Sequence, residues 1–146
     1  MYMNNKTKKN NIRKNKTQKN NKRNNVIDKI SNRFSELLNT FKLYNWNTKS
    51  YGVHNATDSL YDELNKSINK FIEVLISKDC KRIRMVEKEI KMIDNKELKN
   101  CIYDFREFLT NMTNVFSKEK DTDILTICEN ILIHINRILY LSTFNK

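Results

Sequence analysis

The 146-residue chain contains no proline and a single glycine, Gly52. All-β folds need frequent turn residues, so this composition argues against them and leaves helical periodicity as the main signal. One glycine also excludes a glycine-rich phosphate loop. The three cysteines, Cys80, Cys101 and Cys128, form no Cys-x-x-Cys or Cys-x-x-His pair, so their spacing does not indicate a zinc site. Their odd number and wide separation predict reduced thiols that pack as small hydrophobic residues.

Targeting signals and long apolar runs are also missing. The basic start of the chain is not followed by an apolar segment, so no signal peptide is predicted. The longest apolar stretch, residues 131–141, contains His134, Asn136 and Arg137 and is shorter than the roughly 20 residues that a transmembrane helix needs. We therefore expect a soluble, intracellular protein without a membrane partner.

Acidic residues are absent from the first 25 positions, although the whole chain has 17 Asp and Glu against 28 Lys and Arg. Most of the formal net charge of +11 therefore belongs to this segment, and the rest of the chain is nearly balanced. The segment is rich in Asn and has few apolar residues to bury, so residues 1–25 are predicted to be a disordered tail ahead of a folded unit, 26–146. Its basic residues are Lys6, Lys8, Lys9, Arg13, Lys14, Lys16, Lys19, Lys22 and Arg23.

Apolar residues recur at spacings of three and four through most of the remaining chain, which predicts four amphipathic helices and an all-α four-helix bundle. The predicted helices are 26–47, 51–77, 95–117 and 122–143, with an irregular crossover, strand or short helix, at 78–94. The predicted inward-facing residues of the first and fourth helices are Ile27, Ile30, Phe34, Leu37, Phe41 and Tyr44, and Ile124, Ile127, Cys128, Ile131, Ile135, Ile138 and Leu139. Those of the second and third are His54, Thr57, Tyr61, Leu64, Ile68, Phe71 and Leu75, and Leu98, Cys101, Phe105, Phe108 or Leu109, Met112 and Val115 or Phe116. Ser50 and either Asp121 or Thr122 are the predicted N-caps.

Some residues lie beside these stripes. Trp46 and Tyr51 are expected to pack against the turn between the first two helices, with the lining of a site as the alternative. Leu60, Ile72 and Ile76 lie next to the stripe of the second helix and would need a cover, which predicts self-association through the first two helices.

His54 and Asp58 form a candidate metal site at the start of the second helix. Residues i and i+4 share one face of a helix, so both side chains can reach one ion. Glu73 is a third candidate, but fifteen helical residues place it roughly 22 Å from Asp58, so it can join only from a second, antiparallel subunit. The alternative is a histidine that hydrogen-bonds to the acid one turn later.

The segment Trp46-Asn47-Thr48-Lys49-Ser50-Tyr51, followed by His54, Asp58, residues 61–64 and Glu73, resembles the ferritin-like DNA-protection proteins of starved cells, the Dps family. It is more similar still to ferritin-like proteins of large DNA viruses and phages, in which a Tyr-Leu doublet like Tyr140-Leu141 lies near the end of the chain. The resemblance implies a ferritin-like bundle that forms a dimer or larger assembly. For a viral protein it places the chain in the host cytoplasm, the nucleus or the virion.

The resemblance also implies a ligand set for iron or another divalent metal. His54 and Asp58 would come from one subunit and Glu73 from its partner. Asn45 stands where the family has a histidine, and Asn69 where it has the partner's aspartate. An asparagine offers one neutral carbonyl oxygen, a weak ligand for iron, so metal binding is expected to be weak, and ferroxidase activity is possible but not expected.

The basic tail has a function that needs no metal. A flexible segment of nine cations attracts nucleic acid without sequence preference, and several tails on one assembly would strengthen this contact. Lysine-rich tails of Dps proteins act in this way, so the resemblance implies the same contact here. Nuclear targeting and a merely solvated low-complexity segment remain alternatives. The sequence thus predicts a Dps-like metal-binding and nucleic-acid-binding protein, or else a non-catalytic ferritin-like structural or packaging protein.

Overall fold

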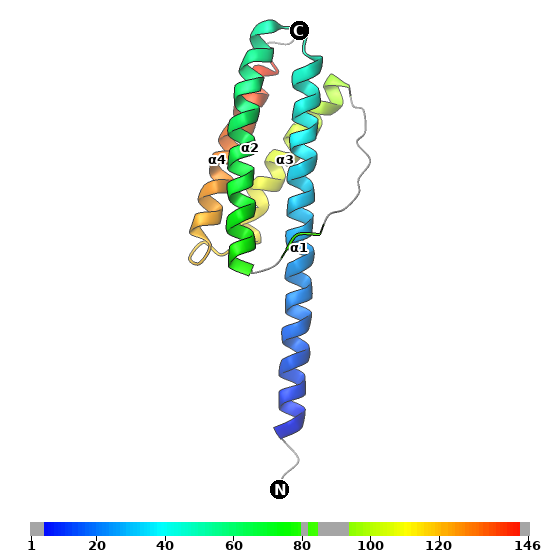
Figure 1. Cartoon of the computed structure of the whole chain (residues 1–146), viewed down its shortest axis with the longest axis vertical. Coiled ribbons are helices and arrows are strands. Elements are labelled where there is room, and N and C mark those ends of the chain that lie inside the picture. The colour runs from blue at the N-terminus through cyan, green and yellow to red at the C-terminus, as the bar shows by residue number, and fades with distance from the viewer. Residues whose placement is uncertain (1–4, 80–81, 85–93, 144–146) are drawn as a thin grey trace.

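The computed structural model describes residues 5–79, 82–84 and 94–143, with the side chains of residues 5–24, Asn95 and Lys96 left out (Figure 1). Over this part of the chain the protein is all-α. Its elements are α1 (Asn5–Asn47), α2 (Tyr51–Asp79), α3 (Asn95–Thr110), a 3₁₀ turn η1 (Asn111–Asn114) and α4 (Thr122–Leu141). The prediction of an all-α four-helix bundle is therefore confirmed.

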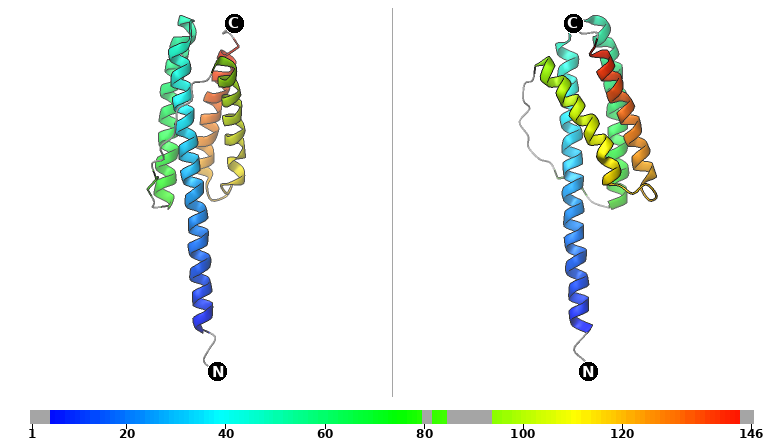
Figure 2. Two further views of the ribbon diagram at one scale, coloured as in Figure 1. Left: turned by 90° about the vertical axis from the view of Figure 1, so that its right-hand side faces the viewer. Right: turned by 180° about the vertical axis from the view of Figure 1, so that it is seen from behind.

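Each helix packs against two others. α1 and α4 both contact α2 and α3, so α1 lies diagonally opposite α4. α2 returns antiparallel to α1, and α3 and α4 form a second antiparallel pair (Figures 1 and 2). α2 and α3 run in the same direction, so the connection between them must cross the length of the bundle.

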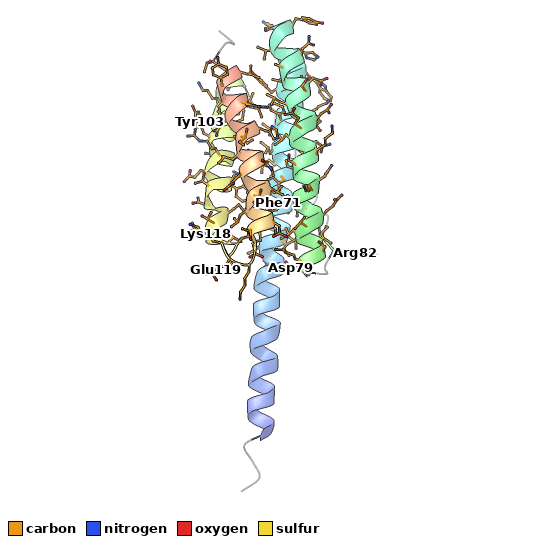
Figure 3. The ribbon with its side chains drawn as sticks, turned by 90° about the vertical axis from the view of Figure 1, so that its left-hand side faces the viewer. Phe71, Asp79, Arg82, Tyr103, Lys118 and Glu119 are labelled. Atoms are coloured by element: carbon orange, nitrogen blue, oxygen red, sulfur yellow. The ribbon has the colours of Figure 1, made fainter. Side chains whose placement is uncertain are left out.

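The core lies where the four apolar stripes meet. Every residue predicted to face inward on α1 and on α4 is buried. Phe34 on α1 contacts the ring of Phe71 on α2 edge-on at 5.0 Å and that of Phe108 on α3 at 6.1 Å. Phe71 points to the centre of the bundle in Figure 3, whereas Tyr103 lies on the outer side of α3. These aromatic contacts join three of the four helices.

The stripe of α3 differs by one position from the prediction. Ile102 is buried, whereas Cys101 is half-buried. Met112 and Phe116 are buried as predicted, but they lie in and after the 3₁₀ turn, because α3 ends at Thr110 and not near residue 117.

Two helix starts are capped by side chains. The Ser50 hydroxyl accepts a hydrogen bond from the Val53 amide at 3.3 Å, which confirms this N-cap of α2. At α3, Asp94 Oδ1 accepts from the Glu97 amide at 2.8 Å, and Glu97 Oε2 accepts from the Asp94 amide at 3.3 Å, a reciprocal capping box. Asp121 occupies the N-cap position of α4 but makes no side-chain cap hydrogen bond.

The structure differs from the predicted disordered tail, because residues 5–25 belong to helix α1. α1 continues back to Asn5 and projects beyond the bundle (Figure 1). No proline or glycine precedes the buried stripe, so nothing in residues 5–26 stops the helix, and Lys and Arg are good helix formers.

Residues 82–84 follow α2 and lie against α1, where the Arg84 amide donates to Asp28 Oδ1 at 3.3 Å. Ile83 packs on the core. The rest of the predicted crossover, 80–81 and 85–93, lies outside the described residues, so its choice between strand and short helix stays a prediction.

α4 is long and apolar enough to cross a membrane, with a mean hydropathy of 1.4, contrary to the expectation from residues 131–141 alone. Its apolar stripe is buried against α2 and α3. The core helix of a soluble bundle meets the same length and hydropathy criteria, so this helix is weak evidence for a membrane span.

Candidate functional site at the α1–α2 corner

The α1–α2 corner (residues 44–57) joins the last turn of α1 to the first turns of α2. The Thr48 amide donates to the Tyr44 carbonyl at 3.1 Å, and the His54 amide donates to the Ser50 carbonyl at 2.8 Å. These bonds extend the helical pattern into the connection from both sides, so the corner is short and closely defined.

Asn45 lies inside this corner and is only 1% exposed. Its Nδ2 donates to the His54 carbonyl at 3.0 Å and to Thr57 Oγ1 at 2.8 Å. The buried Thr57 hydroxyl lies 2.8 Å from the Val53 carbonyl, to which it donates. Both amide hydrogens of Asn45 therefore link α1 to α2 through buried polar bonds.

His54 makes the reverse link from α2 to α1. Its Nδ1 lies 2.9 Å from the Asn45 carbonyl oxygen, which can only accept, so Nδ1 carries the hydrogen. In the neutral imidazole this leaves the lone pair on Nε2. Histidine ligands of metals are commonly held by such a bond from the other ring nitrogen to a backbone carbonyl. His54 is half-buried, and its bond to the Asn45 carbonyl holds it in the tautomer whose Nε2 can coordinate a metal.

Asp58 is exposed one turn after His54 on the same face of α2. Asn69 and Glu73 are also exposed, but they lie several turns further along α2. The fold therefore brings His54 and Asp58 together and keeps Glu73 apart from them. Among the described residues there is no group of three His, Cys, Asp or Glu side chains that could hold a metal ion within one chain.

Asn45 has a different environment from the one expected of a weak ligand. Its amide is buried within one chain and donates its hydrogens to α2. The sequence signal for this role is Thr57, a small polar residue on the buried stripe of α2, which needs a hydrogen-bonding partner from a neighbouring helix.

The other expectations for this region are wrong in part. Trp46 and Tyr51 are exposed and do not pack against the turn as predicted. Leu60 is buried within its own chain, and Ile72 is half-buried against the core. These residues therefore give less reason for self-association than the sequence suggested.

A second polar cluster lies between α2 and α4. Glu63 Oε2 is 3.3 Å from His134 Nδ1 and 3.5 Å from Arg137 Nη1. His134 Nδ1 is buried and has no hydrogen bond of suitable geometry, so its contact with Glu63 is an ion pair only when His134 is protonated. Burial lowers the pKa of His134, and Arg137 lowers it further, while the Glu63 charge opposes both effects. His134 thus lies at the edge of the α4 stripe, facing α2.

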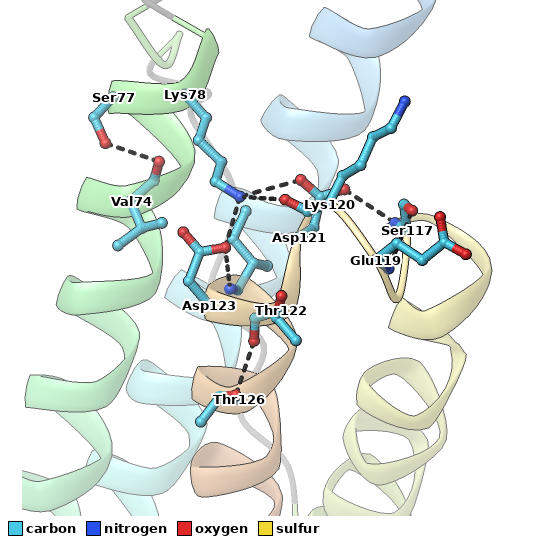
Figure 4. A network of polar contacts seen from close by, with 11 residues as sticks. Val74, Ser77, Lys78, Ser117, Glu119, Lys120, Asp121, Thr122, Asp123 and Thr126 are labelled. Carbon is cyan, nitrogen blue, oxygen red and sulfur yellow. Dashed lines mark hydrogen bonds and ion pairs between the residues drawn. The ribbon is translucent and has the colours of Figure 1, made fainter.

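Lys78 joins the end of α2 to the start of α4 (Figure 4). Its Nζ is 2.6 Å from Asp123 Oδ1, 3.2 Å from Asp121 Oδ1 and 3.2 Å from the Lys120 carbonyl. The hydrogen bond between Lys78 and Asp123 raises the pKa of the lysine and lowers that of the acid. The cluster is exposed and fixes the end of the bundle opposite the α1–α2 corner.

Neither described cysteine has the character of a nucleophile. Burial raises the pKa of Cys128 to about 12 and also raises that of the half-buried Cys101. Thiolates carry the reactivity of cysteine, so both are expected to act as packing residues. Cys80 lies outside the described residues.

The fold and the corner show that the protein is an all-α four-helix bundle whose first two helices are joined by buried hydrogen bonds. The chain belongs to a family of unknown function, DUF5856, whose family model matches residues 45–141, about two thirds of the chain. No curated protein and no solved structure matches it. This family gives no link to the ferritin-like or Dps proteins, so that resemblance remains an expectation.

Proposed function

We propose that the protein is a ferritin-like bundle that binds a divalent metal ion weakly between two copies of the chain and contacts nucleic acid through the basic start of α1. His54 and Asp58 would supply ligands from one copy and Glu73 from the other. The observation that carries the metal site is the 2.9 Å contact of His54 Nδ1 with the Asn45 carbonyl, because it leaves Nε2 as the coordinating nitrogen.

The course of the helices supports the ferritin-like part of this proposal. Ferritin-like bundles have one long crossover connection, whereas up-down-up-down bundles have short loops only. Here α2 ends where α4 begins, as the Lys78 contacts show, and α3 begins at the opposite end. The connection between α2 and α3 is therefore the one long crossover.

The second candidate is a ferritin-like scaffold without metal chemistry that acts as a structural or packaging component. The burial of Asn45 favours it, since a site shared by two copies is then left with three candidate ligands: the half-buried His54 and the exposed Asp58 of one copy, and the exposed Glu73 of the other. Asn69 is neutral and adds no charge to hold a ferric ion. Ferroxidase turnover is therefore not part of the leading proposal.

Anaerobic titration with ferrous iron, with mass from light scattering, separates the two candidates. Saturable binding should be lost in both His54→Ala and Glu73→Ala. The matched controls are His134→Ala, which changes the other histidine, and Glu129→Ala, which changes an exposed acid on α4. Binding by a monomer, or binding that survives either site variant, would contradict a site shared by two copies.

Mixing the two variants that are expected to lose metal binding gives a sharper test. A symmetric dimer has two equivalent sites, so a heterodimer of the His54→Ala and Glu73→Ala chains contains one intact site and one doubly defective site. Random exchange should then restore about a quarter of the wild-type binding capacity. Binding that stays absent after subunit exchange, verified with a tagged copy, would mean that the two residues do not share an ion.

The nucleic-acid contact has its own readout. Changing Lys19, Lys22 and Arg23 together to Gln should make the salt dependence of duplex DNA binding shallower, by up to about 0.9 per lost phosphate contact. Lys66 and Lys70, exposed on α2, are the control pair for the same substitution. Equal effects from both sets would assign the binding to overall charge and not to the start of α1.

A further inference from the structure

The α1–α2 corner exposes aromatic rings that the core does not use. Trp46 is 65% exposed and Tyr51 80%, although both are large apolar residues beside a fully formed core. Tyr140, 64% exposed, lies on α4 three residues beyond Arg137 toward the same end of the bundle. At 150–250 Å² for each ring, the exposed area of the two corner rings, Trp46 and Tyr51, is roughly 220–360 Å².

The charge at this corner has one sign. No Asp or Glu occurs between Glu36 and Asp58, while Lys42 and Lys49 lie in that interval. Lys42 Nζ is 4.5 Å from the centre of the Tyr61 ring and 5.8 Å from that of Trp46. The aromatic surface is therefore bordered by ammonium groups, and the first acid on α2 lies two turns after Tyr51.

The corner also holds its rings in a fixed frame. Asn45 precedes Trp46 directly, and its buried bonds to His54 and Thr57 anchor the last turn of α1 to α2. Tyr51 begins α2 behind the Ser50 cap. A surface that is ordered before binding loses less conformational entropy when a ligand arrives.

We propose that this corner binds single-stranded nucleic acid, with bases stacked on Trp46 and Tyr51 and phosphates near Lys42 and Lys49. Exposed aromatic rings beside cations are the general means by which proteins hold single strands. The positive charges of Lys42 and Lys49 favour an anionic occupant. The area is also well below the roughly 800 Å² per partner of a stable dimer. This surface lies on the same corner as His54, and it is separate from the basic start of α1.

Trp46 provides a direct readout because it is the single tryptophan of the chain. It lies 23 residues along α1 from Arg23, the last residue of the basic start of α1, a distance of roughly 35 Å, so a short strand bound only at the start of α1 would not touch its ring. Titration of the full-length protein with oligothymidylate should quench Trp46 emission saturably. A duplex of the same length should bind, by anisotropy, without this quenching.

The variants test stacking and charge separately. Tyr51→Ala should weaken oligothymidylate binding at the corner about tenfold or more, and Tyr51→Phe, which keeps the ring, should restore it. Lys49→Gln should make the salt dependence of quenching shallower. Tyr103→Ala, on the outer side of α3, is the control and should leave quenching unchanged. Circular dichroism of each variant checks that the exposed substitutions leave the fold intact.

Three results would overturn the proposal. Single strands that bind by anisotropy without changing Trp46 emission would place all binding elsewhere. Equal quenching by duplex would mean contact with phosphates and no stacking. A blue shift of Trp46 with anionic phosphatidylserine vesicles, without a response to oligothymidylate, would make the corner a membrane-binding surface.

Discussion

Replacing Asn45 by Ala should destabilise the bundle more than any other single polar substitution at the α1–α2 corner. The change removes two buried hydrogen bonds, of 3.0 Å to the His54 carbonyl and 2.8 Å to Thr57 Oγ1. At about 1–1.5 kcal/mol for each bond, the free energy of unfolding should fall by about 2–3 kcal/mol. For a folded unit of this size the midpoint of thermal unfolding should fall by roughly 6–15 °C.

The matched control for this prediction is Asn47→Ala, two residues further along α1. Asn47 is exposed, and its Nδ2 donates to the Leu43 carbonyl at 2.8 Å within the same helix. Loss of this exposed bond should change the stability by no more than about 0.5 kcal/mol. Urea and thermal unfolding followed by circular dichroism measure both variants, and equal stabilities would refute the assigned role of Asn45.

Asn45→Asp separates a structural role from a ligand role. The introduced carboxylate cannot donate to the His54 carbonyl, so it should destabilise the protein more than Ala does. A carboxylate is a stronger metal ligand than an amide, so the ligand role predicts tighter ferrous binding by this variant. Tighter binding with unchanged stability would therefore show that the amide does not lock the corner.

Two further predictions concern titratable groups in the interior. Burial lowers the pKa of His134 below 6.5, so the unfolded chain binds a proton at this residue more readily, and the free energy of unfolding should fall as the pH drops through about 6.5. His134→Gln should reduce this fall in unfolding measurements between pH 7.5 and 5.5. A pH profile that is unchanged in the variant would be evidence against the lowered pKa of His134. In a Cys80→Ser background at pH 8, a thiol reagent should modify Cys101 slowly. It should modify Cys128, whose pKa is raised to about 12, only when the protein unfolds globally. Prompt modification of both thiols in the native protein would contradict the burial of Cys128.

The stripes of α1 and α4 were predictable because their apolar residues repeat without ambiguity, so that every inward position from Ile27 to Tyr44 is buried. The stripe of α3 was less predictable, because Cys101 and Ile102 are neighbouring apolar residues and periodicity alone cannot show which of them faces inward. The helical state of residues 5–25 differs from the predicted disorder, because a polar composition does not exclude a helix in a segment without proline or glycine.

The candidate site could be predicted only in outline. The i, i+4 spacing of His54 and Asp58 placed them on one face before the fold was known. The tautomer of His54 could not be read from the sequence, because it depends on the Asn45 carbonyl, which the corner brings within 2.9 Å across nine residues. The exposure of Trp46 was equally hidden, since nothing local distinguishes an aromatic residue that packs from one that faces solvent.

The length of α1 has a consequence for measurements of size. Its 43 residues form a rod roughly 64 Å long. A compact chain of 146 residues has a radius of gyration of only about 15 Å, so this rod extends well beyond the surface of such a globule. A monomer with this shape has a large hydrodynamic radius and should elute early from a sizing column, like a heavier globular protein. Early elution therefore says nothing about a second copy, and only a mass determined independently of shape, by light scattering or sedimentation equilibrium, measures self-association.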